Sequence, residues 1–158
     1  MLKLWSSNSI FLTSFSANKK RSSLLLNKIN ELLKGKIKNK NICFLGVTFK
    51  ANTDDMRDSS TLTMIPSLAK KGARINYYDP TGEKNVFKKI KNVTFVNNIK
   101  FAIHNSDLVI IHTDWNDFKS INFKSMIKKK NFIIYDMRNI YSPLKMKKAK
   151  IKYFGIGR

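Results

Sequence analysis

The chain has 158 residues, of which 42% are hydrophobic, so it can close one hydrophobic core and is too short for two full domains. Its 31 Lys and Arg outnumber its 10 Asp and Glu and give a formal net charge of +21, which would attract a polyanion. The lysines are spread along the whole chain with no recognised nucleic-acid motif, which favours a solvated basic surface over a nucleic-acid site.

The first 17 residues and the single cysteine indicate the cellular compartment of the protein. Residues 1–17 form a poor signal peptide, because serines break their apolar patch, and we leave this segment unassigned and expect it to be disordered. No apolar stretch reaches the roughly 20 residues that span a bilayer. Cys43 lies inside an apolar run, as a buried thiol without a disulfide partner would. These features predict a cytoplasmic protein without a membrane partner.

The first regular element is an amphipathic helix over residues 18–33. Its apolar residues recur at helical spacing, and Gly35 follows at the position of a helix stop. The apolar stripe must pack either against the rest of the chain or against the same helix of a second subunit.

Short apolar runs then alternate with helix-like segments, as in a parallel sheet with helices on both faces. Strands are predicted over residues 42–47, 73–78, 93–96, 108–112, 132–135 and 151–154, and helical crossovers over 62–71, 100–105 and 123–129. The pattern predicts a single α/β domain with a doubly wound, mostly parallel, Rossmann-like sheet of five or six strands, preceded by the amphipathic helix. Pro66 lies inside the first crossover and is expected to kink or delay it.

Ligands of such sheets bind at the carboxyl ends of the strands, so the residues after each strand are the candidates for a site. The loop over residues 49–60 offers two cations, Lys50 and Arg57, close to a helix start whose free amides suit a phosphate. An equally weighted alternative has Asp58 or Ser60 capping the helix while the two cations pair with Asp54 and Asp55.

Other polar or aromatic residues after strands are weaker candidates. Arg138 follows the fifth predicted strand and can grip a phosphate or sugar hydroxyls, although a salt bridge with Asp136 or Asp79 is slightly favoured. Trp115 is assigned to the core. His104 and His112 have no neighbours at metal-ligand spacing, so both are interpreted as packing residues and no metal site is predicted.

Several spaced motifs resemble one family. The string GVTFKANTDDMRDS over residues 46–59 closely resembles the signature that opens the C-terminal domain of UDP-glucose and GDP-mannose dehydrogenases. The companions follow in the family's order: GAR at 72–74, YDP at 78–80, SD at 106–107, TDW at 113–115 and DMRN at 136–139. The resemblance covers residues 18–158, and its TDDMRDS form leans toward UDP-glucose 6-dehydrogenases.

The resemblance implies an NAD-dependent oxidation of UDP-glucose to UDP-glucuronate, in which this domain binds the UDP part. By the family's pattern, Phe49, Lys50 and Arg138 bind the nucleotide sugar and Arg57 comes near the phosphates of the NAD cofactor. Residues 18–35 correspond to the end of a central dimerisation helix, and residues 36–158 to the UDP-sugar-binding domain. UDP or UDP-glucose is the expected ligand, and a homodimer through residues 18–35 or a separately encoded N-terminal half is the expected protein partner.

The sequence also departs from the family's pattern. The 158 residues contain neither the glycine fingerprint of the family's NAD domain nor its catalytic cysteine motif, so no catalytic residue is assigned. Cys43 matches an apolar strand position and cannot replace that cysteine. Ser60 replaces a common proline and Met137 a frequent glycine. The chain alone is therefore expected to bind UDP or a UDP-sugar without catalysis; the alternatives are a subunit of a split dehydrogenase and a basic nucleic-acid-associated module.

Overall fold

The computed structural model describes residues 20–157, and its centre is a six-stranded parallel sheet. The strands are β1 (Asn41–Leu45), β2 (Arg74–Tyr78), β3 (Val93–Phe95), β4 (Leu108–Ile111), β5 (Ile133–Asp136) and β6 (Lys152–Gly155). Their order across the sheet is β3-β2-β1-β4-β5-β6, and all five neighbouring pairs are parallel. The predicted doubly wound α/β fold is confirmed. The expectation for residues 1–17 lies outside the described residues.

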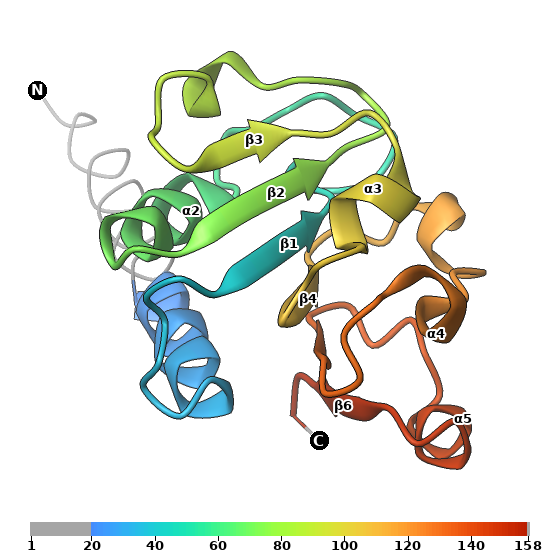
Figure 1. Cartoon of the computed structure of the whole chain (residues 1–158). Coiled ribbons are helices and arrows are strands. Elements are labelled where there is room, and N and C mark those ends of the chain that lie inside the picture. The colour runs from blue at the N-terminus through green and yellow to red at the C-terminus, as the bar shows by residue number, and fades with distance from the viewer. Residues whose placement is uncertain (1–19, 158) are drawn as a thin grey trace, which may run out of the picture.

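Helices cover both faces of this sheet (Figure 1). One face carries the helix that is described from residue 20 to residue 32, together with α2 (Thr61–Lys70). The other carries α3 (Ile99–Ile103), α4 (Phe123–Met126), α5 (Pro143–Lys148) and the short 3-10 turn η2 (Asn116–Phe118); a second such turn, η1 (Asn85–Phe87), precedes β3. Pro66 lies inside α2, which nevertheless begins at Thr61, so the predicted delay of this helix is wrong.

Two hydrophobic cores hold these layers together. Leu25 and Ile29 of the first helix, and Leu33 directly after it, are buried in the same core as Ile65 and Leu68 of α2. These residues of the apolar stripe therefore pack against their own domain, whereas Leu24 of the same helix is exposed. The second core, which includes Trp115 and Phe118, fills the opposite face, as the core assignment of Trp115 predicts.

Because every strand is parallel, the loops that follow the strands meet at one edge of the sheet. This edge carries residues 46–60, 79–84, 112–115 and 137–141. Within residues 20–157, no helix combines the length and the apolar character that crossing a bilayer requires.

Candidate functional site

Gly46 allows the loop after β1 to start in a crowded position. Its φ is +75°, and a methyl group placed on it would lie 2.5 Å from Thr113 Cβ and 2.7 Å from Thr113 Oγ1. Thr113 is fully buried and donates a hydrogen bond from Oγ1 to the Thr48 carbonyl oxygen at 3.0 Å. The left-handed backbone favours glycine here, and the close approach to Thr113 requires it.

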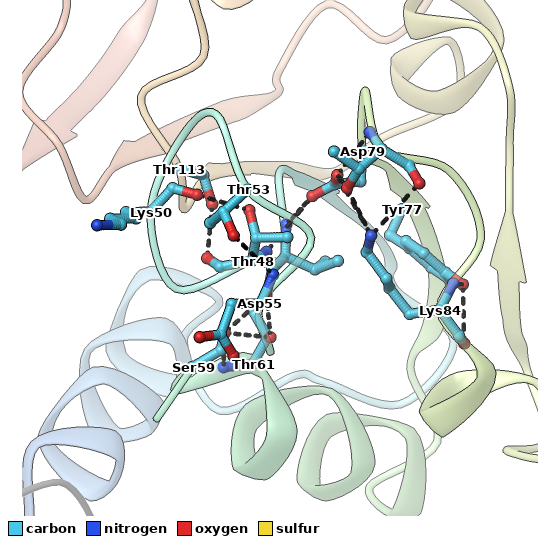
Figure 2. A network of polar contacts seen from close by, with 12 residues as sticks. Thr48, Lys50, Thr53, Asp55, Ser59, Thr61, Tyr77, Asp79, Lys84 and Thr113 are labelled. Carbon is cyan, nitrogen blue, oxygen red and sulfur yellow. Dashed lines mark hydrogen bonds and ion pairs between the residues drawn. The ribbon is translucent and has the colours of Figure 1, made fainter. Parts of the chain in front are cut away.

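A buried carboxylate fixes the next two residues of the loop. Asp79, at the end of β2, accepts hydrogen bonds from the backbone N–H groups of Val47 (2.9 Å) and Thr48 (3.4 Å). Its other oxygen accepts bonds from Thr81 N (3.0 Å) and Thr81 Oγ1 (2.5 Å) and lies 3.8 Å from the buried ammonium of Lys84. Figure 2 shows this Asp79–Lys84 pair beside the loop. The carboxylate thus acts as an internal clamp between β1 and β2.

Hydroxyl groups close the other end of the loop onto its beginning. Ser59 Oγ and Thr61 Oγ1 both donate to the Val47 carbonyl oxygen, at 2.6 and 2.8 Å. Between these ends, Phe49 N donates to the Asp55 carbonyl oxygen at 2.9 Å. The motif residues therefore fold the loop back on itself and deliver the chain to the start of α2. The side chain of Lys50 points away from this network (Figure 2).

A pocket of about 190 Å³ lies beside this loop at the carboxyl edge of the sheet. Its lining comes from the first helix, the loop after β1, and the segments after β4, β5 and β6. The lining residues are Arg21, Leu25, Phe49, Lys50, Asp58, Ser59, Ser60, His112, Met137, Arg138 and Ile156. Three cations therefore converge on one concave site.

The structure brings Phe49, Lys50 and Arg138 together at this pocket and leaves Arg57 outside its lining. The Arg57 side chain is 88% exposed and pairs with Asp55 at 3.0 Å from Nη2 to Oδ2. Hydrogen bonds from Arg57 lower the pKa of the Asp55 carboxyl. Arg57 thus forms the surface pair with Asp55 that the alternative predicts, whereas no ion pair of Lys50 is found among residues 20–157.

Arg138 braces two loops with its guanidinium group. Nε donates to the His112 carbonyl oxygen at 2.7 Å, and Nη2 donates to the Phe49 carbonyl oxygen at 2.9 Å. Asp136 accepts from the Arg138 backbone N–H at 3.0 Å, and within residues 20–157 the guanidinium forms no salt bridge with Asp136 or Asp79. The slightly favoured salt-bridge interpretation of Arg138 is therefore wrong, and its two bonds use two of the five N–H donors of the guanidinium.

Among the lining residues to which the sequence analysis gave no binding role are Arg21, Ser60 and His112. Ser60 precedes α2 without forming a side-chain cap bond, because its Oγ lies 2.9 Å from His112 Nε2. Burial, together with the charges of Arg138 and Arg21, lowers the pKa of His112 to about 3. The position of Arg21 could have been predicted from the sequence, because Arg21 lies four residues before Leu25 and so on the same side of the first helix.

Comparisons with known proteins identify the domain. A sequence profile described as "UDP-glucose/GDP-mannose dehydrogenase family, UDP binding domain" matches residues 43–143. The chain belongs to this family. UDP-glucose 6-dehydrogenase from Rickettsia felis is 35% identical over 144 residues, covering 89% of this chain and 32% of that protein. The enzyme of the same name from Rhizobium meliloti is 35% identical over 149 residues, covering 92% of this chain and 34% of that protein.

Solved structures agree on the fold. A UDP-glucose dehydrogenase from Pyrobaculum islandicum superposes with a TM-score of 0.69 at 24% identity, over 89% of this chain and 30% of that one. An NDP-N-acetyl-D-galactosaminuronic acid dehydrogenase from Methanosarcina mazei gives a TM-score of 0.71 at 23% identity, over 88% and 29%. The UDP-binding domain therefore spans about a third of the length of the relatives it matches.

The acidic residue at the end of β2 is not free to bind the ribose of a dinucleotide. In dinucleotide-binding sheets an acidic residue some 20 positions after the glycine fingerprint binds the ribose. Here Asp79, at the end of β2, is fully buried and holds the backbone of the β1 loop. Within residues 20–157, no cluster of three His, Cys, Asp or Glu side chains could hold a metal ion.

Proposed function

We propose that this domain binds the UDP part of a nucleotide sugar in the pocket between the β1 loop and Arg138, with UDP-glucose as the preferred ligand. It would contribute this binding to the NAD-dependent oxidation of UDP-glucose and would not catalyse that reaction by itself. The observation that carries the proposal is the convergence of Arg21, Lys50 and Arg138 on one pocket at the carboxyl edge of the sheet.

The charge and shape of the pocket support a diphosphate. The N-terminus of α2, which is the positive end of the helix dipole, lies at the pocket. Its first turn contains no acidic residue that would compete with a phosphate for the backbone amides. Lys50 supplies a point charge. The guanidinium of Arg138 has further N–H donors, beyond the two that bond backbone carbonyls, and these can bind a phosphate. Phe49 is 47% exposed at the rim, where its ring can cover the apolar side of a nucleotide.

The domain alone is proposed to be inactive because the oxidation requires a cofactor and a nucleophile. Hydride transfer needs a bound nicotinamide, and the family's thiohemiacetal needs a reactive cysteine. Cys43, the one cysteine of the sequence, is fully buried in β1, and burial raises the pKa of its thiol far above neutral pH. This thiol is therefore unable to serve as the nucleophile.

Calorimetric titration with UDP tests the site. The Lys50→Ala, Arg138→Ala double variant should bind UDP at least about 100-fold more weakly, because bonds to charged groups contribute about 1.5–3 kcal/mol each. The matched control is Arg74→Ala, Lys100→Ala, which removes the same charge from residues that do not line this pocket. Equal heats from the double variant and the unaltered protein would refute the site.

The same titration weighs the polyanion alternative, which rests on the net charge of +21. If the net charge alone drives binding of duplex DNA, the affinity for duplex should fall steeply with salt, and saturating UDP should leave this affinity unchanged. A protein that binds duplex with this steep salt dependence and ignores UDP would favour the nucleic-acid module instead. Circular dichroism at equal protein concentration establishes that each variant is folded before its heats are compared.

A further inference from the structure

Ser60 and His112 form a hydrogen-bonded pair inside the pocket that the proposed function does not use. Ser60 Oγ lies 2.9 Å from His112 Nε2, and His112 Nδ1 lies 3.2 Å from Thr113 Oγ1. Thr113 Oγ1 in turn donates to the Thr48 carbonyl oxygen at 3.0 Å. Four residues from two segments of the chain therefore make one hydrogen-bond chain that ends at the pocket.

The direction of this chain follows from its buried end. The Thr113 hydroxyl has one hydrogen, which the carbonyl oxygen of the fully buried Thr48 receives. Thr113 Oγ1 must then accept from the ring, so Nδ1 of His112 carries the hydrogen and Nε2 is the acceptor. The Ser60 hydroxyl donates to Nε2. Reversing the chain would take the donor away from a buried carbonyl, which is unfavourable by about 1–3 kcal/mol.

The hydroxyl hydrogen of Ser60 is thus turned away from the ligand, and its oxygen can only accept. We propose that Ser60 is a specificity-determining residue whose oxygen accepts a hydrogen bond from a ligand hydroxyl or N–H group. The pocket would then select an anion that also carries a donor, such as UDP-glucose, over bare pyrophosphate. This inference rests on the proposed function, because it assumes that the cationic side of the pocket holds the diphosphate.

The surroundings of His112 keep this direction fixed. The ring is 5% exposed, and the nearby charges of Arg138 and Arg21 disfavour a second ring hydrogen. A protonated ring would donate from both nitrogens and would turn the Ser60 hydroxyl hydrogen toward the pocket. A neutral ring with a pKa of about 3 is also a poor base near neutral pH, so the pair is suited to orienting Ser60 and not to activating it as a nucleophile.

Ser60→Ala tests the proposal without removing a helix cap, since the Ser60 side chain forms no cap bond at α2. Calorimetry should show that this variant binds UDP-glucose about 5- to 10-fold more weakly and pyrophosphate within about twofold of the unaltered protein. Ser60→Thr, which keeps the hydroxyl, should restore UDP-glucose affinity. Ser67→Ala is the matched control, because Ser67 Oγ lies in the same helix and bonds the Thr63 carbonyl oxygen.

Nitrogen chemical shifts of the His112 ring give an independent readout of the tautomer. They should report a neutral ring with its hydrogen on Nδ1 from pH 5 to pH 8. A hydrogen on Nε2, or a Ser60→Ala variant that weakens both ligands equally or pyrophosphate alone, would overturn the inference and leave the proposed function standing. An unaltered protein that binds neither ligand would refute the proposed function itself.

Discussion

Replacing Asp79 with alanine should be the most damaging single change at this edge of the sheet. The side chain accepts two hydrogen bonds from the backbone of the β1 loop and two from Thr81, and it faces the ammonium of Lys84 at 3.8 Å. The side chains of Asp79 and Lys84 are 0% and 7% exposed. Breaking a buried ion pair by removing one partner destabilises a protein by about 3–5 kcal/mol, because the remaining charge is stranded. We expect this loss from Asp79→Ala.

Removing the other partner should have a smaller effect. Lys84→Met leaves the Asp79 carboxylate with its four N–H and O–H donors, so the expected loss of unfolding free energy is about 1–2 kcal/mol. The double variant should be more stable than Asp79→Ala alone, because it removes the stranded ammonium. Urea denaturation of the four proteins completes the cycle, with Glu31→Ala as an exposed-pair control whose expected effect is about 0–1 kcal/mol.

The two single variants test whether the Asp79 clamp stabilises the fold. A loss below about 1 kcal/mol for Asp79→Ala, or equal losses for Asp79→Ala and Lys84→Met, would refute the reasoning from burial. UDP titration of Asp79→Ala adds a functional readout. The clamp holds Val47 and Thr48, which lead into Phe49 and Lys50, so this variant should also bind UDP more weakly where it remains folded.

Three further predictions concern single residues. Gly46→Ala should lose at least about 2 kcal/mol more unfolding free energy than Gly82→Ala. Both glycines have positive φ, but of the two only Gly46 has neighbours within 4 Å of an added methyl group. Equal losses in the two variants would contradict the contact with Thr113. The pKa of His112 is lower in the folded protein than in the unfolded chain, so the stability that its neutral ring contributes is lost as pH falls below about 6.5. The unfolding free energy should drop by about 2 kcal/mol from pH 7 to pH 5, and by less in His112→Gln. Arg57→Ala should bind UDP as the unaltered protein does, while Arg138→Ala binds it more weakly; calorimetric heats that fall equally in both would place Arg57 in the UDP site.

The sequence predicted the sheet well because its strands are short apolar runs with clear stops. All six predicted strands occur, with ends shifted by at most two residues. The helix α5 (Pro143–Lys148) was missed, although Ser142 followed by Pro143 is a recognisable helix start. This helix buries only Met146 among its six residues, so it has no apolar periodicity to detect.

The candidate site was only partly predictable, because its geometry depends on contacts between distant segments. The pocket-lining positions of Phe49, Lys50 and Arg138 follow from their places after strands. The bond from Arg138 to the Phe49 carbonyl spans 89 residues, and that from Ser60 to His112 spans 52. Such pairings depend on the registers of β1, β4 and β5, which no local pattern specifies.

The position of the pocket on the sheet links the clamp to ligand choice. The strand order places the switch of direction between β1 and β4, where sheets of this kind bind their ligands. On the β2 side of β1, Asp79 bonds to the β1 loop, Thr81 donates to Asp79, and Lys84 donates to Thr81, so these three residues occupy this side of the edge. The pocket therefore opens on the other side, over His112 after β4 and Arg138 after β5, with Arg21 of the first helix in its lining. If UDP binds as proposed, the clamp that stabilises the loop also directs this ligand toward the cations of this side.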